Sequence, residues 1–250
     1  MRSPLIEAAC AFQLSLDAAG RSGAANMAID AALLDRANGT GLSFLRLYRF
    51  HPPCLSLGRN EPAARYDHAE IARRGLDVVR RPTGGRAVWH EHEVTYAVAA
   101  PVAAFGSLRQ AYHTIHERIA AALRSLGANA TLAPAPHQAP PASRVDQPTS
   151  CFATPVGGEV LVAGRKLVGS AQVRKGNAFL QHGSILLEGS QEVVAAISRT
   201  PQVVRAATTL SAELGRRIAW DEVTGAILRA WGDDISFPTL LSHLAPLGVA

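Results

Sequence analysis

The sequence predicts an α+β fold in which mixed β-sheets are flanked by helices. Residues 108–126 place apolar side chains at helical spacing. Short β-favouring segments occur elsewhere, above all the aromatic run LSFLRLYRF at residues 42–50. The two kinds of segment are interspersed and no internal repeat is visible, so we expect a single domain over residues 1–250.

The first half of the chain alternates between helical and extended patterns. A helix is predicted over residues 26–37, with Asn26 as its N-terminal cap and Gly39 after its end. After the strand at 42–50, a proline turn leads into a second strand, CLSLG. The next expected elements are a helix at 61–74, a strand at 76–79, the loop RRPTGGR and one long strand at 87–101.

The second half begins with the amphipathic helix. His113, His116 and Glu117 lie off its apolar stripe and are interpreted as a solvated face. Five prolines between residues 133 and 148 exclude regular structure and predict an exposed loop. A meander follows over residues 159–187, with Lys166 and Ser170 expected on one face of a strand and Gly169 and Ala171 on the other. Two helical stretches close the chain, the second with an apolar stripe formed by Trp220, Val223, Ile227 and Trp231.

Composition and charge restrict the possible partners and compartment. The chain has 250 residues, 48% of them hydrophobic, and a net charge of +5, which favours acidic partners. Its three cysteines are odd in number and widely spaced, so a reducing compartment is expected. No stretch reaches the roughly 20 apolar residues of a membrane span, and the N-terminus lacks a signal-peptide core. We therefore expect a cytoplasmic protein that does not enter a membrane.

Cys151 and Lys166 are the candidate catalytic residues. Cys151 follows the proline-rich loop, where a thiol can be exposed, whereas Cys54 lies within an apolar strand and is expected to be structural. A thiol has a pKa of about 8.5, so a nucleophilic cysteine needs a nearby cation to stabilise its thiolate. Lys166, in GRKLVGSAQ, is a candidate for that cation, and the alternative is a solvated lysine beside a hairpin turn.

Two further patterns suggest ligand binding. The loop RRPTGGR, residues 80–86, combines paired glycines with three arginines and suits an anion, although a basic hairpin turn is equally compatible with it. His90, Glu91, His92 and Glu93 suggest a metal site, but strand alternation would place them two and two on opposite faces. No further ligand has convincing spacing, so we expect no metal.

Four stretches in order resemble the biotin/lipoate protein ligase and transferase superfamily. They are NMAIDAALL, PPCLSLGRNEPA, RRPTGGRAVWHEHEVTYAV and GRKLVGSAQVRKGNAFLQHGSILL, which together extend from about residue 26 to residue 187. The resemblance implies a fold related to the biotin ligase catalytic domain. It also implies that Lys166 lies beside the reacting carbonyl and that the substrate is bound by Arg80, Arg81, Gly84, Gly85, Arg86, His90, Gly169, Ser170 and Ala171.

Within that superfamily the chain resembles the octanoyltransferase (LipM-type) branch more closely than the ATP-dependent ligases. The pair Cys151-Phe152, followed by a hairpin and Gly164–Lys166, is similar to the cysteine loop of those transferases. The resemblance implies transfer of octanoyl from acyl carrier protein, through a Cys151 thioester, to a lysine of a lipoyl domain or of the glycine-cleavage H protein. No cofactor is then needed, because one thioester replaces another in the first step.

Two other functions remain open from the sequence. One is an ATP-dependent lipoate-protein ligase that forms lipoyl-AMP, in which Cys151 would be incidental. The other is a basic nucleic-acid-binding module. An aromatic content of only 6% and the absence of a helix with clustered arginines argue against nucleic acid as a partner.

Overall fold

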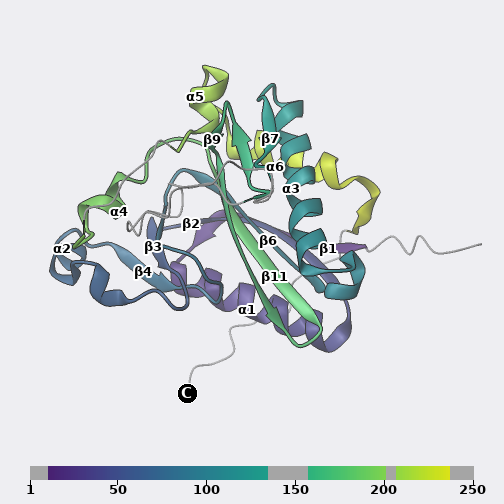
Figure 1. Ribbon diagram of the computed structural model, residues 1–250, viewed down its shortest axis with the longest axis horizontal. Coiled ribbons are helices and arrows are strands. Elements are labelled where there is room, and N and C mark those ends of the chain that lie inside the picture. Colours follow the sequence, from purple (N-terminus) through teal and green to yellow (C-terminus); the bar gives the residue numbers. More distant parts are fainter. Residues whose placement is uncertain (1–10, 135–156, 201–206, 237–250) are drawn as a thin grey trace, which may run out of the picture.

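The computed structural model describes residues 11–134, 157–200 and 207–236. These residues form a six-stranded mixed sheet, two three-stranded sheets and helices packed against them (Figure 1). The expected α+β fold with mixed sheets flanked by helices is confirmed. None of the helices in these ranges is long and apolar enough to cross a bilayer.

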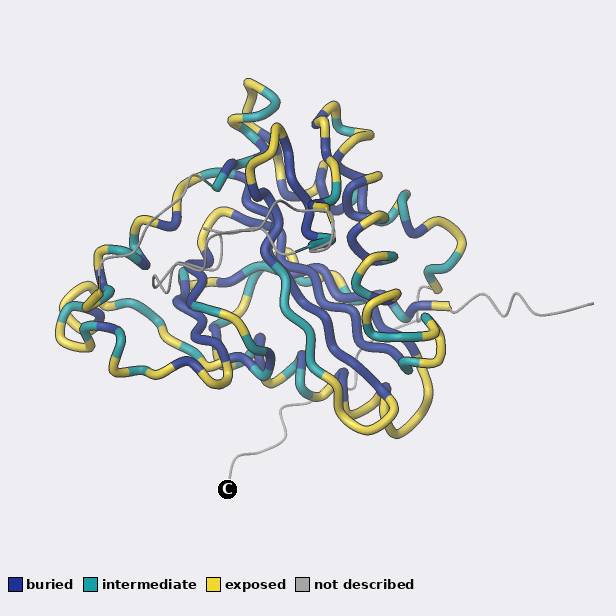
Figure 2. Tube along the Cα trace, viewed as in Figure 1, coloured by how far each residue is buried: buried dark blue, intermediate teal, exposed yellow. Residues whose placement is uncertain are grey.

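The central sheet has the strand order β10-β11-β6-β2-β1-β12. Adjacent strands from β10 to β2 are antiparallel to one another, whereas β1 runs parallel to both β2 and β12. The strands are β1 (Phe12–Arg21), β2 (Ser43–Phe50), β6 (Glu93–Pro101), β10 (Val168–Lys175), β11 (Ala178–Leu186) and β12 (Ile235–Ser236). Figure 2 shows that the middle strands are buried along most of their length, as a sheet covered on both faces requires.

Two small sheets lie beside the central one. The first has the order β4-β3-β5, formed by Asp77–Arg80, Cys54–Leu57 and Val88–His90. The second has the order β7-β8-β9, formed by Ala130–Leu132, Val160–Val162 and Arg165–Lys166. The loop RRPTGGR connects β4 to β5, so its position depends on the first small sheet.

The helices cover opposite faces of the central sheet. Helix α1 (Gly23–Thr40) packs on Ala97 and Ala99 of β6, whereas α3 (Leu108–Ser125) and α6 (Trp220–Trp231) pack on the side of Tyr96 and Val98. Successive side chains of a strand point to opposite faces, so β6 contributes to both cores. The shorter helices are α2 (His68–Arg73), α4 (Glu192–Ala196) and α5 (Leu210–Leu214), and the 3₁₀ helices are η1 (Ala63–Arg65), η2 (Val102–Phe105) and η3 (Gly232–Asp234).

The strongest periodic patterns were predicted correctly. Helix α3 begins at Leu108, strand β2 covers Ser43–Phe50, and all four members of the apolar stripe in α6 are buried. The cap of α1 was predicted incorrectly, because Ser22 caps the helix and accepts from the Ala25 N–H. Asn26 is instead buried one turn inside the helix, where its Nδ2 donates to the carbonyls of Arg21 and Arg49.

Three expected elements are divided in the structure. The helix expected at 61–74 is split into η1 and α2, because the Asp67 side chain caps a new helix start. The strand expected at 87–101 is two strands, since β5 pairs with β3 in the small sheet and β6 pairs in the central sheet. The strand containing Lys166 likewise ends there, and β10 begins at Val168 in another sheet.

Candidate active site

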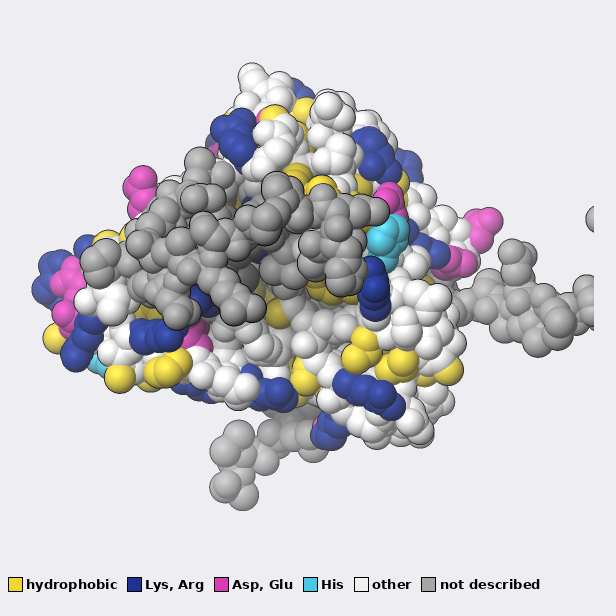
Figure 3. Space-filling view, in the orientation of Figure 1, with side chains coloured by type: hydrophobic (Ala, Val, Ile, Leu, Met, Phe, Trp, Pro, Cys, Tyr) yellow, Lys and Arg dark blue, Asp and Glu magenta, His cyan; other side chains and the backbone are white. Residues whose placement is uncertain are grey.

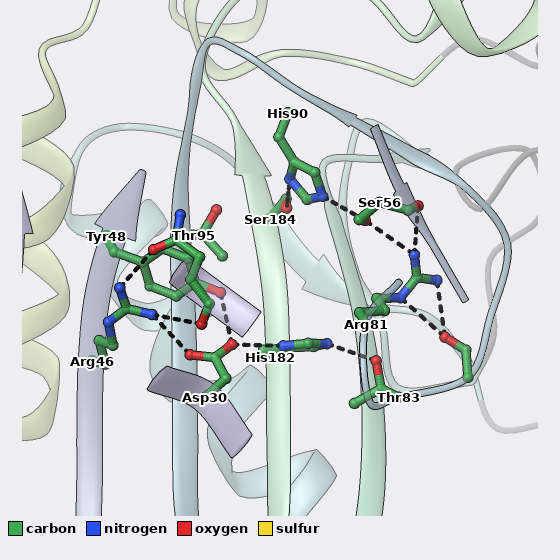
Figure 4. Close-up of polar contacts among 12 residues, drawn as sticks. Asp30, Arg46, Tyr48, Ser56, Arg81, Thr83, His90, Thr95, His182 and Ser184 are labelled. Carbon is green, nitrogen blue, oxygen red and sulfur yellow. Dashed lines mark hydrogen bonds and ion pairs between the residues drawn. The ribbon is translucent and has the colours of Figure 1, made fainter. Parts of the chain in front are cut away.

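A cleft of about 360 Å³, part of it open to solvent, lies between the α1 face of the central sheet and the first small sheet. Its apolar wall includes Met27, Phe50 and Val88. Five of the predicted substrate-binding residues line it, namely Arg81, His90, Gly169, Ser170 and Ala171. The cleft also has polar walls formed by two hydrogen-bond networks (Figure 4). A partly apolar cleft with a few fixed polar groups is typical of a small-molecule site.

The first network is centred on Asp30, which is fully buried in α1. Its Oδ1 accepts from Arg46 Nη1 at 2.9 Å, and its Oδ2 accepts from Tyr48 OH at 2.8 Å and from His182 Nδ1 at 2.9 Å. Burial and the adjacent Asp30 carboxylate raise the pKa of the Tyr48 hydroxyl, which therefore stays protonated. The Arg46 charge is compensated inside the protein by Asp30.

His182 connects this network to the glycine-rich loop. Since Asp30 accepts from Nδ1, the Nε2 of a neutral His182 is left as an acceptor, and the Thr83 hydroxyl lies 2.6 Å from it. Thr83 is fully buried, and its carbonyl accepts from the Arg59 N–H. The loop is therefore held against α1 through the chain Thr83, His182 and Asp30 (Figure 4).

The second network joins Ser56, His90 and Glu93. His90 Nε2 lies 2.7 Å from Ser56 Oγ, and its Nδ1 lies 2.7 Å from Glu93 Oε1. The His90 ring stacks on Phe50 at a centroid distance of 4.1 Å. Glu93 also accepts from Thr95, and Ser184 Oγ lies 3.3 Å from His90 Nδ1. These contacts fix the orientation of the imidazole at the cleft.

The arginines of the RRPTGGR loop bind the backbone of the loops around them. Arg81 donates to the carbonyls of Ser56, Gly84 and Arg86, and Arg80 donates to those of Gly58, Arg59 and Glu61. A Cβ at Gly58 would lie 1.9 Å from the Gly85 carbonyl oxygen, so the two loops require glycine at this contact. Arg80, Gly84, Gly85 and Arg86 are not among the cleft-lining residues, and their substrate contacts stay a prediction.

Lys166 is buried rather than solvated. Its Nζ lies 2.7 Å from Glu159 Oε1, and the two side chains are only 2% and 3% exposed. The alternative of a solvated lysine beside a turn is therefore wrong, because strand β9 directs this side chain inward against β8. Cys151 and Phe152 lie outside the described residues. Cys54 is buried as expected, and burial, with Asp77 nearby, raises the pKa of its thiol.

A third polar cluster lies on the other face of the central sheet, next to α3. His116 Nε2 lies 2.8 Å from Ser170 Oγ, its Nδ1 lies 2.7 Å from the Gly158 carbonyl, and Ser170 Oγ lies 2.6 Å from Tyr96 OH. The interpretation of His116 as part of a solvated face was wrong, since it is fully buried. Burial, with a smaller contribution from Lys166, lowers the pKa of His116 to about 4, so the imidazole is neutral.

The metal hypothesis also changes with the structure. His90 and Glu93 are not on opposite faces of one strand, because the chain bends at residues 91 and 92 between β5 and β6, and the two side chains come together. Within the described ranges, no three His, Cys, Asp or Glu side chains gather as metal ligands do. The close pair is instead part of the hydrogen-bond network with Ser56.

Sequence reasoning missed the partners that organise the cleft. Asp30, Ser56 and His182 lie within the four family-like stretches but were not singled out, and Glu93 was considered only as a possible metal ligand. A usable signal was Asp30 within NMAIDAALL, because an acid inside an apolar helix needs a buried partner. Ser56 gives no comparable signal, since a serine in a short strand is common.

Comparison with known proteins gives a consistent result. The family model described as the lipoyl protein ligase A/B catalytic domain matches residues 22–232. An octanoyltransferase LipM from Kyrpidia tusciae is 40% identical over 185 residues, which cover 72% of this chain and 68% of the relative. One from Moorella thermoacetica is 39% identical over 223 residues, which cover 82% of this chain and 80% of the relative.

The solved structures agree on the fold. A crystal structure of lipoate-protein ligase A bound with ATP has a TM-score of 0.72 and 20% identity, covering 91% of this chain and 87% of the other. A bipartite lipoate protein ligase from Thermoplasma acidophilum has a TM-score of 0.66 and 20% identity, covering 90% of this chain and 86% of the other. At these identities the likeness concerns the fold alone.

Proposed function

The chain belongs to the lipoyl protein ligase A/B catalytic domain family, and we propose that it is an octanoyltransferase acting in protein lipoylation. The observation that carries this function is the identity of 34–40% to octanoyltransferases LipM over most of the chain. The cleft supports it, because its wall of Met27, Phe50 and Val88 suits a medium-length acyl chain.

The donor is an octanoyl thioester of acyl carrier protein. The Cys151 thiolate attacks the thioester carbonyl, the carrier thiolate leaves, and octanoyl remains on the enzyme as a new thioester. A lysine ε-amine of a lipoyl domain or of the glycine-cleavage H protein then attacks and forms an amide. Thioester exchange needs little free energy, so ATP is not required, and the two steps predict ping-pong kinetics.

Lys166 is the cation of this mechanism. Its burial with Glu159 holds the ammonium group in a fixed position in a medium of low polarity, where its charge acts more strongly than in water. There it stabilises the Cys151 thiolate and the oxyanion formed during each transfer. Removal of one such donor costs on the order of 3 kcal/mol in other enzymes, so Lys166→Met is expected to reduce the rate about a hundredfold.

The surface charge suits the acidic carrier protein. The chain carries a net charge of +5, and Figure 3 shows Lys and Arg side chains over the end of the molecule with α2 and β4 and along its lower edge. Such a field accelerates association with an acidic partner and is screened by salt. The apparent KM for the carrier protein is therefore expected to rise with ionic strength.

The experiment is intact-protein mass spectrometry after mixing the enzyme with octanoyl acyl carrier protein in the absence of ATP. The wild type should gain one octanoyl group that hydroxylamine removes, and Cys151→Ala should gain none. Cys54→Ala is the matched control, because its buried thiol has a raised pKa and should not carry the acyl group. Modification of the acceptor only with ATP and free lipoate would instead establish a ligase.

A further inference from the structure

The proposed reaction releases protons only in its second half. In the first half one thiolate enters and another leaves, so no net proton moves. In the second half a lysine ammonium and an acyl thioester become an amide and a thiol, which releases one proton. The acceptor ammonium therefore needs a proton acceptor, and Lys166 is poorly suited to this role because Glu159 already pairs with it as an ammonium ion.

We infer that Ser56 and His90 form the proton relay that deprotonates the acceptor lysine, with Glu93 as a positioning residue. This inference rests on the proposed function. The observation that carries it is a chain of two 2.7 Å hydrogen bonds, Ser56 Oγ to His90 Nε2 and His90 Nδ1 to Glu93 Oε1, at the wall of the cleft. Ser56 and His90 both line that cleft.

Counting donors and acceptors fixes the direction of each hydrogen bond. The Arg81 guanidinium can only donate, and its Nη1 lies 3.1 Å from Ser56 Oγ, so Ser56 accepts there. Glu93 Oε1 accepts from Thr95 and from His90, so His90 carries its proton on Nδ1. With a neutral imidazole, Nε2 is then the acceptor and the Ser56 hydroxyl is the donor in the contact between them that Figure 4 shows. This is the direction in which a relay must run.

The proton transfer balances along this chain. Before the attack, one N–H bond of the lysine ammonium breaks and its proton passes to Ser56 Oγ. The Ser56 O–H proton passes to His90 Nε2 at the same time, which leaves a neutral amine. The amine attacks the acyl-enzyme carbonyl, the Cys151 thiolate leaves, and the attacking nitrogen loses a further proton to that thiolate to give the amide and the thiol. Arg81 stabilises negative charge on Ser56, and the Glu93 carboxylate stabilises the imidazolium. His90 then releases its proton to water, which is the one proton that the reaction sets free.

The geometry also resembles a nucleophile with its base, so Ser56 as an acyl carrier is the competing role. Two facts favour the relay. The Ser56 side chain is held between Arg81 and His90, and the residue is only 1% exposed. A relay requires only a hydrogen bond from the amine, whereas a nucleophile must move onto the carbonyl carbon.

The test separates the two halves of the reaction. Acyl-enzyme formation and its discharge to a lipoyl domain are each followed by rapid quenching and intact-protein mass spectrometry for wild type, Ser56→Ala and His90→Gln. The expected result is discharge slowed by about 10²-fold or more, the usual loss for general-base catalysis, with a far smaller change in the rate of acylation. Ser56→Ala retains the backbone carbonyl that binds Arg81, so it tests the relay even if His90→Gln fails to fold.

Two controls make the result specific. His92→Gln changes a histidine two residues away that is 53% exposed and outside the cleft, and it should behave as wild type. Hydroxylamine is largely unprotonated at neutral pH and needs no base, so it should discharge the variant and wild-type acyl-enzymes equally. A structural defect in the cleft would slow hydroxylamine as well.

The outcomes distinguish the inference from the proposed function. If the wild type forms no hydroxylamine-labile adduct and modifies no acceptor, the proposed function fails and the relay fails with it. If the wild type transfers octanoyl but Ser56→Ala slows both halves or neither, only the relay is overturned. An octanoyl adduct on Cys151→Ala that is lost when Ser56→Ala is added would make Ser56 a nucleophile and also overturn the relay.

Discussion

Strands β6 and β11 carry polar groups on both faces of the central sheet. The groups on the cleft face, called here the cleft-face network, and the cluster around His116 on the α3 face differ in how they are stabilised. On the cleft face, Asp30 and Arg46 are charged partners, and histidines His90 and His182 are bound by carboxylates. On the α3 face, the groups around His116 are the hydroxyls of Ser170 and Tyr96 and the Gly158 carbonyl. Neighbouring residues such as Thr95 and Tyr96 therefore belong to different networks, because alternate side chains point to opposite faces.

The two faces differ in what keeps their polar groups stable inside the folded protein. Buried charges on the cleft face need their partners, since removing one leaves the other uncompensated in a medium of low polarity. The neutral cluster on the α3 face needs His116 to remain unprotonated. The cleft-face network should therefore be sensitive to loss of a charge, and the α3-face cluster to acid.

The largest effect is expected from Asp30→Asn. The variant leaves the Arg46 guanidinium, which is 1% exposed, with its longer 3.3 Å contact to Asp17 as the remaining ion pair. Loss of one member of a buried pair typically costs about 3–5 kcal/mol in the free energy of unfolding. Urea denaturation at neutral pH measures this. A loss below about 1 kcal/mol would mean that the cleft-face network does not depend on its charges.

Acidification is expected to act mainly through His116. An unfolded histidine has a pKa near 6.5, and His116 in the folded protein has a pKa of about 4, so the unfolded state binds more protons between these values. The contribution of neutral His116 to the free energy of unfolding is complete above pH 6.5. It falls by roughly 3 kcal/mol in total as the pH drops towards 4. The free energy of unfolding measured from pH 7 to 4.5 should fall less steeply in His116→Gln. Parallel curves would contradict this role.

Gly183→Ala tests a cleft-lining position that lies beside the α3-face cluster. Gly183 lines the cleft, and a Cβ there would lie 2.4 Å from Ser170 Oγ, 2.6 Å from the Gly169 carbonyl oxygen and 2.8 Å from Tyr96 Cε1. The overlap should cost about 1–3 kcal/mol in stability. Gly39→Ala is the control, because nothing lies within 4 Å of its Cβ and alanine favours the α1 helix. Equal thermal midpoints for the two variants would show that strands β10 and β11 accommodate the added methyl group at little cost in stability.

The smallest effect is expected from Asp35→Asn, which removes a charge pair outside both networks. Asp35 pairs with Lys175, and the two side chains are 56% and 59% exposed. Exposed pairs contribute about 0–1 kcal/mol, so urea denaturation should show a change of less than 1 kcal/mol, reduced further by salt. A loss comparable to that of Asp30→Asn would remove the distinction between buried and exposed charges.

The sequence predicted the long periodic elements but not where strands change sheets. Helix α3 and strand β2 follow from local spacing, which a single segment contains in full. The break between His90 and Glu93 and the break at Leu167 depend on which strand each segment pairs with. Pairing is decided by distant segments. A prediction from alternation alone therefore continued both strands past the points where the chain changes sheets.

The candidate site was predicted in the same uneven way. Arg81, His90 and the segment 169–171 line the cleft, and the sequence identified them because the family-like motifs are contiguous. Ser56 and His182 were not identified, because their roles come from contacts across 34 and 152 residues of sequence, and Glu93 was considered only as a metal ligand. The buried state of Lys166 and His116 was likewise not visible in their immediate neighbours.

The sequence alone determined the fold class, the family resemblance and the candidate pair Cys151 and Lys166, because these depend on local periodicity and on contiguous motifs. Tertiary structure alone decided the partners: Glu159 for Lys166, Asp30 for His182, and Ser56 with Glu93 for His90. The physical reason is that hydrogen bonds and burial act over a few ångströms, and only folding brings residues far apart in the chain within that range.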